Sequence, residues 1–163
     1  MEIPNSFNIA REKSSFTING LYGMNLTKIF KLDHSAFYAE FDPWRKSNEN
    51  EVPVNGVYVV MANEEIPRCL KPDPQGILYI GRGNIMSYHN RIGNLINSFN
   101  GQPGVHEAGI RFHRNPLFQK RFPISSLKVG ITLTEEPQEL EKQLLQDYFQ
   151  EFGDVPPLNR VAY

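Results

Sequence analysis

The sequence predicts an α+β domain in which a small, mainly antiparallel three-stranded sheet is flanked by helices. Three β-branched, apolar segments, residues 56–61, 77–81 and 127–133, are typical of strands. Two segments with apolar residues at helical spacing, 84–99 and 135–152, predict the main helices. The 163 residues amount to one ordinary domain. The resulting element order, β-β-α-α-β-α, favours helices packed on the faces of one sheet.

Residues 1–52 are predicted to form an N-terminal extension packed on a main domain of residues 53–163. Four apolar residues within the extension are spaced as in a short helix, with Asn25 as its cap: Leu26, Ile29, Phe30 and Leu32. A polar loop, residues 47–51, follows Trp44.

The first two strands are expected to pair as an antiparallel hairpin. Residues 56–61 are apolar at every position after the glycine, which is typical of a central strand buried on both faces. The connection, residues 62–76, contains Pro67, Pro72 and Pro74 and is therefore predicted to be an irregular loop.

The helices are predicted from periodicity and from their ends. The first begins near Asn84 and stops at Asn100-Gly101, and its apolar side is formed by Ile85, Tyr88, Ile92, Leu95, Ile96 and Phe99. A basic stretch, residues 106–122, is predicted to be a short helix with a loop. Thr134 is expected to cap the last helix, which ends at Phe152-Gly153.

Composition excludes several classes of protein. Apolar residues make up 40% of the chain and charged residues 21%, which is typical of a globular protein and not of a disordered one. No apolar run is long enough to span a membrane, and the first residues do not have the pattern of a secretory signal. Cys69 is the only cysteine, so an internal disulfide is excluded and a reducing, cytoplasmic location is expected.

The net charge of −1 conceals two oppositely charged segments. Between residues 82 and 128 there are seven basic residues and one acidic residue, Glu107. Between residues 135 and 154 there are seven acidic residues and one basic residue, Lys142. A basic surface on a nearly neutral protein can bind a polyanion, because the local potential sets the attraction. An ordinary solvated surface accounts for the same charges equally well.

Glu141 is the first residue that points to chemistry. On a helical projection it falls within the apolar side of the last helix, which contains Leu140, Leu144, Leu145, Tyr148, Phe149 and Phe152. A carboxylate among apolar side chains requires a cation or hydrogen-bond donors. Either a metal ion or an arginine would meet that requirement.

Two short motifs connect these observations. Gly56-Val57-Tyr58 on one strand and Tyr79-Ile80-Gly81 on the next resemble the paired signature of the GIY-YIG nuclease superfamily. The resemblance continues in order with an arginine, a histidine, a glutamate and an asparagine: Arg91, His106, Glu141 and Asn159. It covers residues 54–160, about two thirds of the chain. A dinucleotide-binding fingerprint is excluded because Met86 stands where its third glycine would be.

The chain departs from the family pattern in three ways. The 21 residues that separate Tyr58 from Tyr79 exceed the usual hairpin, and Val57 replaces an isoleucine. Leu95 stands where some members have a histidine, which leaves His89 and His106 as candidates for its role.

The resemblance implies a metal-dependent endonuclease that hydrolyses phosphodiester bonds in DNA, of a restriction, mobile-element or phage-conflict type. It implies one Mg²⁺ or Mn²⁺ ion held by Glu141, and an Arg91 that neutralises the scissile phosphate. Tyr58 would act as general base or position the water, and Tyr79 would bind the phosphate or hold Tyr58. His106 would position water or relay a proton. Asn159 would order the glutamate or the tyrosines.

The expected partner is double-stranded DNA, and the sequence allows a homodimer. Six residues are predicted to contact DNA: Arg82, His89, Arg111, Arg114, Lys120 and Arg121. Aromatic residues alternate with them in the basic stretch, among them Phe112 and Phe122. Ordinary structural roles account for the same residues: core tyrosines, a loop histidine and surface arginines. The alternative function is an inactive GIY-YIG-like module that binds nucleic acid or another protein.

Overall fold

A computed structural model describes residues 8–12, 15–19, 25–26, 28–50, 52–62, 64–87 and 89–160, and the side chains of Leu26 and of residues 28–160 within these ranges. Tyr88, which was predicted to lie on the first helix, is outside the described residues. Among the described helices, none combines the length and the apolar character that crossing a membrane requires.

The α+β prediction is confirmed, but the main sheet has four strands rather than three. Its order is β4 (Lys28–Lys31), β7 (Lys128–Leu133), β5 (Asn55–Met61) and β6 (Ile77–Asn84), and every neighbouring pair is antiparallel. Strand β6 therefore forms one edge of the sheet. A separate antiparallel sheet consists of β1 (Asn8–Glu12), β2 (Ser15–Asn19) and β3 (Asn25–Leu26).

The predicted helix at Leu26–Leu32 is wrong, because this segment is extended and supplies β3 and β4. Strand β4 pairs with β7, where backbone hydrogen bonding across the sheet outweighs the weak helical spacing of a few apolar residues. Phe30 and Leu32 point into the same core as the central strand residue Tyr58.

Helix α1 (His34–Asn48) occupies the second half of the predicted N-terminal extension. Its cap is Asp33, whose carboxylate accepts the backbone N–H of Ala36. The expected polar loop is shorter than predicted, since α1 includes Ser47 and Asn48. The ring of Trp44 packs edge-on against Phe30 with 5.5 Å between centroids. Residues 28–48 thus share one hydrophobic core with the rest of the domain.

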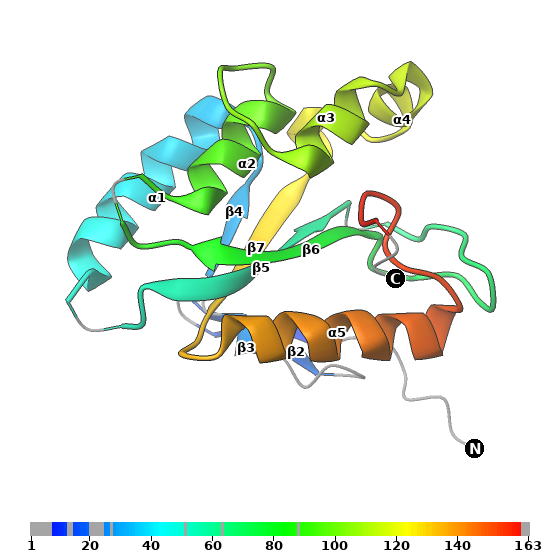
Figure 1. Ribbon diagram of the computed structural model, residues 1–163, viewed down its shortest axis with the longest axis horizontal. Coiled ribbons are helices and arrows are strands. Elements are labelled where there is room, and N and C mark those ends of the chain that lie inside the picture. Colours follow the sequence, from blue (N-terminus) through cyan, green and yellow to red (C-terminus); the bar gives the residue numbers. More distant parts are fainter. Residues whose placement is uncertain are drawn as a thin grey trace.

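Helices cover both faces of the four-stranded sheet (Figure 1). Helices α1, α2 (Arg91–Phe99) and α3 (Glu107–His113) lie on one face, and α4 (Pro116–Arg121) and a 3₁₀ turn (Ile124–Ser126) continue from α3. Helix α5 (Pro137–Phe152) covers the other face. Figure 1 shows the edge strand β6 running between α2 and α5.

Two predicted helix starts were wrong. Strand β6 continues to Asn84, and α2 begins only after Asn90, whose side chain accepts the N–H of Gly93 at 2.6 Å. Helix α5 begins after Glu136, and the hydroxyl of Thr134 accepts the N–H of Glu136 before the helix starts. In both places the apolar or capping pattern in the sequence begins before the first residue that has helical geometry.

Candidate functional site

Two glycines of the β5–β6 hairpin lie where a side chain would not fit, and one of them makes room for two tyrosine rings. Gly81 lies opposite Tyr58 in the strand register. A Cβ atom on Gly81 would lie 2.5 Å from Cε1 of Tyr79 and 2.7 Å from Cε2 of Tyr58. Gly56, at the start of β5, is similarly crowded, since a Cβ there would lie 2.4 Å from the backbone oxygen of Thr132. The absence of a side chain at Gly81 makes room for the two rings, whose centroids are 6.2 Å apart.

Tyr58 is hydrogen-bonded to a buried histidine. The Tyr58 hydroxyl lies 3.0 Å from Nε2 of His106, which is the residue that caps α3. The other ring nitrogen, Nδ1, accepts the backbone N–H of Ala108 at 3.2 Å. Because Nδ1 is an acceptor, the proton of the neutral ring is on Nε2, so His106 donates its hydrogen bond to the Tyr58 oxygen.

The charge state of His106 supports this arrangement. Burial, together with the charges of Arg91 and Arg111, lowers the pKa of His106 to about 3. The ring is therefore neutral near pH 7. In this tautomer His106 has no free lone pair with which to take a proton, so it positions Tyr58 and does not act as a base in the relay that the sequence suggested.

Burial of His106 predicts a pH-dependent stability. The unfolded histidine takes up a proton near pH 6.5 and the folded one only near pH 3, so the unfolded state binds more protons as the pH falls. The free energy of unfolding should therefore fall between pH 7 and pH 4, with about 3 kcal/mol of the fall due to this residue. His106→Asn retains a capping side chain without the titration. Urea denaturation should show that the variant loses less stability over this range, and equal losses would contradict the prediction.

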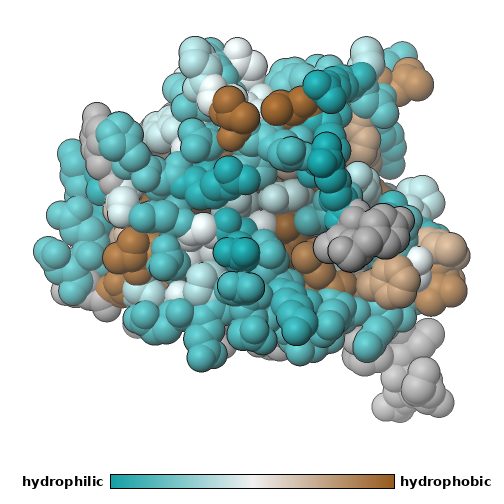
Figure 2. Space-filling model, viewed as in Figure 1, coloured by the Kyte–Doolittle hydropathy of each residue, from teal (hydrophilic) through white to brown (hydrophobic). Residues whose placement is uncertain are grey.

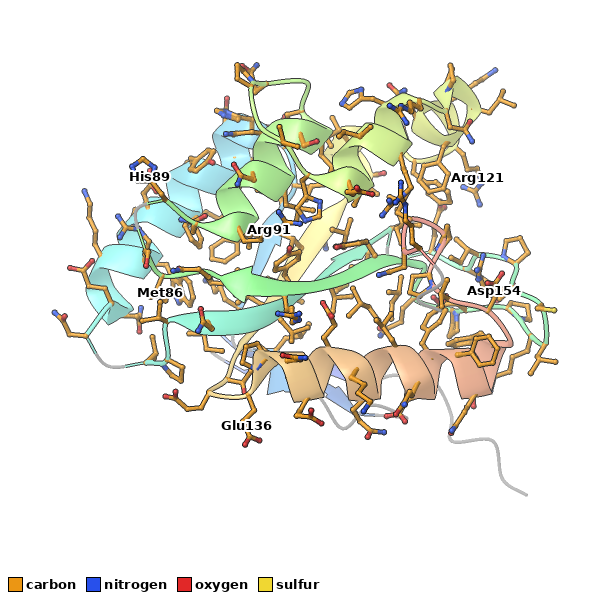
Figure 3. All side chains as sticks on the ribbon, viewed as in Figure 1. Met86, His89, Arg91, Arg121, Glu136 and Asp154 are labelled. Carbon is orange, nitrogen blue, oxygen red and sulfur yellow. The ribbon has the colours of Figure 1, made fainter. Side chains whose placement is uncertain are left out.

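Arg91 and Glu141 approach β6 from opposite sides. Arg91 is the first residue of α2 and is labelled above β6 in Figure 3. Its aliphatic part packs on Gly83, where a Cβ would lie 2.6 Å from the Arg91 Cβ. Glu141 comes from α5 on the other side of the strand.

Both charges act on the two tyrosines. The pKa of each phenol is raised, first by burial and further by the Glu141 carboxylate, whereas Arg91 opposes the rise. Arg91 lowers the pKa of Tyr58 through its charge and as a hydrogen-bond donor that favours the phenolate form. Since the raising causes prevail, both phenols carry their protons at neutral pH in the protein alone.

Glu141 lies at the edge of the apolar side of α5 and not in its middle. Its side chain is 25% exposed, whereas Leu144, Tyr148 and Phe152 are buried. Phe149, which was assigned to the apolar side, is 53% exposed. Figure 2 shows hydrophilic side chains along the outward side of this helix.

Arg82 partly satisfies the Glu141 carboxylate. Its Nε lies 3.3 Å from Oε1, and both side chains remain partly exposed. Burial raises the pKa of Glu141, and the Arg82 charge and hydrogen bond offset part of that rise. The sequence left open whether a metal ion or an arginine balances the Glu141 charge. Arg82 does so in part, although the arginine itself is not buried.

The Glu141 carboxylate could supply one ligand to a hard cation. Arg82 bonds Oε1 only, which leaves Oε2 of a carboxylate open on a partly exposed edge. No cluster of three or more His, Cys, Asp or Glu side chains that could hold a metal occurs within the described parts of the chain. An ion at Glu141 would therefore take its other ligands from water and from substrate oxygens, as Mg²⁺ commonly does.

Asn159 closes the exposed edge of β6. Its carboxamide accepts the N–H of Ile80 at 2.9 Å and donates to the Ile80 carbonyl at 2.8 Å. The neighbouring Leu158 N–H bonds the Leu78 carbonyl, so the C-terminal segment continues the hydrogen-bond pattern of the sheet. Asn159 thus fixes the backbone next to Tyr79 and makes these bonds to main chain, not to the Glu141 or tyrosine side chains.

The six predicted DNA contacts lie on several elements, and three of them pair with acidic residues. Arg82 pairs with Glu141, and Arg111 donates to the Leu158 carbonyl and pairs with Glu107. Figure 3 shows His89 near α1, Arg91 at the centre and Arg121 at the far end of α4. Arg121 pairs with Glu64 at 2.5 Å.

The aromatic residues of the basic stretch belong to the core. Phe112 and Phe122 are buried, and Phe118 bridges them through ring contacts of 5.8 Å and 4.9 Å between centroids. They are therefore not available to stack on bases. The exposed basic residues of this stretch are Arg114, Lys120 and Arg121.

Sequence reasoning missed Arg160 and the role of Glu107. The Glu107 carboxylate pairs with Arg111 at 2.8 Å and with Arg160 at 3.3 Å. Glu107 and Arg160 line a small cavity of about 170 Å³ together with Arg114. The spacing of Glu107 and Arg111, four residues apart in a basic stretch, is the signal that could have indicated their ion pair.

Comparisons with known proteins yield no match. No family model matches the chain, and neither a curated protein nor a solved structure matches it. The functional assignment therefore depends on the chemistry of the residues around β6.

Proposed function

We propose that this protein is a metal-dependent DNA endonuclease of GIY-YIG type that hydrolyses phosphodiester bonds. The observation that supports the proposal is the cluster of side chains around β6: the Tyr58 and Tyr79 rings lie 6.2 Å apart, Arg91 packs on Gly83, and Glu141 pairs with Arg82 of the same strand. These residues lie up to 83 positions apart in the sequence. A purely structural pair of tyrosines does not require an arginine and a glutamate at this edge.

Hydrolysis adds water across the bond between phosphorus and the leaving oxygen. The oxygen of water forms a bond to phosphorus, the leaving oxygen departs with its electron pair and is protonated, and one proton of the attacking water passes to a base. Tyr58 is the base in this proposal, after it has lost its own proton to solvent. The phenolate oxygen would accept hydrogen bonds from His106 Nε2–H and from Arg91, which are the donors that favour the charged form.

Arg91 also has the geometry to neutralise a phosphate. Its guanidinium offers a planar set of donors and no lone pair, and its side chain is exposed at the start of α2. Glu141 would hold one Mg²⁺ or Mn²⁺ ion, which supplies charge stabilisation at the phosphoryl and leaving oxygens when bound. Tyr79, whose ring packs edge-on against His106, would hydrogen-bond the same phosphate.

Incubation of the purified chain with supercoiled plasmid tests the proposal. We expect nicked and linear products with Mg²⁺ or Mn²⁺. We expect none with EDTA, because EDTA removes the metal ion whose charge would stabilise the phosphoryl and leaving oxygens. Plasmid that stays supercoiled with every metal would contradict the enzyme assignment. Retained DNA binding in that case would support the alternative, an inactive nucleic-acid-binding module.

A further inference from the structure

A cleft of about 650 Å³ lies between α1 and the N-terminal end of α2. Tyr38, Arg45 and Lys46 line it from α1, and Arg91 and Asn94 line it from α2. His89 and Arg91, which are labelled in Figure 3, also line it. Clefts that bind small ligands commonly have volumes of about 300–1,000 Å³, which suits a single nucleotide.

The lining of the cleft favours an anionic ligand. Arg45, Lys46 and Arg91 are cationic, whereas Asp42 is the only acidic residue of the lining within the described chain. Arg45 has partners already, since it donates to the Met86 carbonyl and pairs with Glu49, which directly follows α1. Lys46 is exposed and makes no ion pair with any described residue. Its ammonium group is therefore available to a phosphate.

Neutral polar groups in the same cleft could read the edge of a base. The Asn94 carboxamide makes no hydrogen bond to another described side chain or backbone group. The oxygen of the Asn97 carboxamide accepts the Tyr38 hydroxyl at 3.3 Å, which leaves its NH₂ group to donate elsewhere. Asp42 adds a carboxylate acceptor and Tyr38 a half-buried ring. Amides and carboxylates pair with base edges, and aromatic rings stack on bases.

Arg91 connects this cleft to the proposed catalytic site. It lines the cleft, and its aliphatic part packs on Gly83 of β6, the strand that carries Tyr79. A strand whose scissile phosphate contacts Arg91 would therefore place a neighbouring nucleotide at the mouth of the cleft. An intact duplex, about 20 Å wide, cannot enter such a space, and its paired bases do not expose their pairing edges.

We propose that the cleft between α1 and α2 binds one unpaired nucleotide of the substrate strand, adjacent to the scissile phosphate. This inference rests on the proposed nuclease function and adds a preference for DNA with an unpaired or extruded base. Residues of the N-terminal region would then select the substrate, while the β5–β6 hairpin carries out the chemistry.

Binding measured in EDTA tests the cleft without cleavage. The probes are a short DNA duplex with one unpaired adenine, the same duplex fully paired, and free deoxyadenosine monophosphate. By fluorescence anisotropy, the wild-type chain should prefer the unpaired duplex by about 10-fold, the worth of one stacked base. Lys46→Ala combined with Asn94→Ala should reduce this preference to within about 2-fold, since both side chains are exposed and alanine suits α1 and α2.

Lys120→Ala on α4 is the matched control, because it removes an exposed cation far along the chain from the cleft. It should weaken binding of both duplexes by the same factor and preserve the preference. Equal wild-type affinities for the two duplexes would overturn the cleft assignment and leave the nuclease proposal intact. Binding to neither duplex at low salt would overturn both. Tight binding of the free monophosphate, lost in the double variant, would assign the cleft to a free nucleotide and also overturn the inference.

Discussion

Glu141→Gln is expected to abolish metal-dependent cleavage, with a fall of at least about 10³-fold in single-turnover rate. The amide keeps the size of the side chain but removes the negative charge that would hold the cation, and the charge stabilisation supplied by a bound metal amounts to several kcal/mol. Titration calorimetry with Mn²⁺ in the presence of a short duplex should show loss of the binding heat. Cleavage is followed with the same duplex carrying a fluorescent end label.

Glu139→Gln is the matched control for this experiment. Glu139 lies in the first turn of the same helix, and its side chain is exposed. The control variant should cleave at the wild-type rate, and both variants should unfold within about 1 kcal/mol of wild type, because the Arg82–Glu141 pair is partly exposed. Equal metal affinity of Glu141→Gln and wild type would show that the ion pair with Arg82 is the whole role of this glutamate.

Tyr58→Phe should lower single-turnover cleavage by about 10²–10⁴-fold, the usual worth of a positioned acid–base group. The ring stays packed in the sheet, but the hydroxyl that is proposed to accept the proton of the attacking water is gone. The buried Nε2–H of His106 also loses its acceptor, which should cost about 1–3 kcal/mol of unfolding free energy. Tyr79→Phe should have a smaller effect on rate, about 1–3 kcal/mol of transition-state stabilisation.

The pH profile separates a catalytic from a structural Tyr58. Burial raises the pKa of this phenol, so the reactive phenolate is a minor species at neutral pH. The wild-type rate should therefore climb with pH through the neutral and mildly alkaline range, and the rate of Tyr58→Phe should lose that dependence.

Tyr148→Phe provides the control for a buried hydroxyl on the other face of the sheet. The Tyr148 hydroxyl donates to the Asp73 carboxylate at 2.9 Å, in a cluster that contains none of the proposed catalytic residues. Its loss should lower stability by about 1–2 kcal/mol without changing the rate of cleavage by the folded chain. A wild-type rate and pH profile for Tyr58→Phe would remove Tyr58 from the chemistry.

The sheet shows which strands local sequence patterns can predict and which they cannot. The three segments read as strands are strands, and the antiparallel hairpin of β5 and β6 is confirmed. Both strands are rich in β-branched or aromatic residues and are bounded by turn-forming ones, so neighbouring residues contain the signal. The fourth strand, β4, was missed because its conformation depends on pairing with β7, about 100 residues later in the chain.

Local sequence patterns likewise predict one part of the candidate site and not the other. Local motifs were sufficient to select the two tyrosines and the glycines beside them, since the residues of each motif are adjacent in the sequence. The partners of these residues are long-range. The bond between Tyr58 and His106 spans 48 residues, the Arg82–Glu141 pair spans 59, and Asn159 reaches Ile80 across 79.

Only the tertiary structure, therefore, decided the tautomer of His106, the partner of Glu141 and the anchoring role of Asn159. It also created the cleft between α1 and α2 from segments whose periodicity indicated nothing about one another. The physical reason is that periodicity reports which face of an element is buried, whereas hydrogen-bond partners, burial of charge and cavities depend on which faces meet.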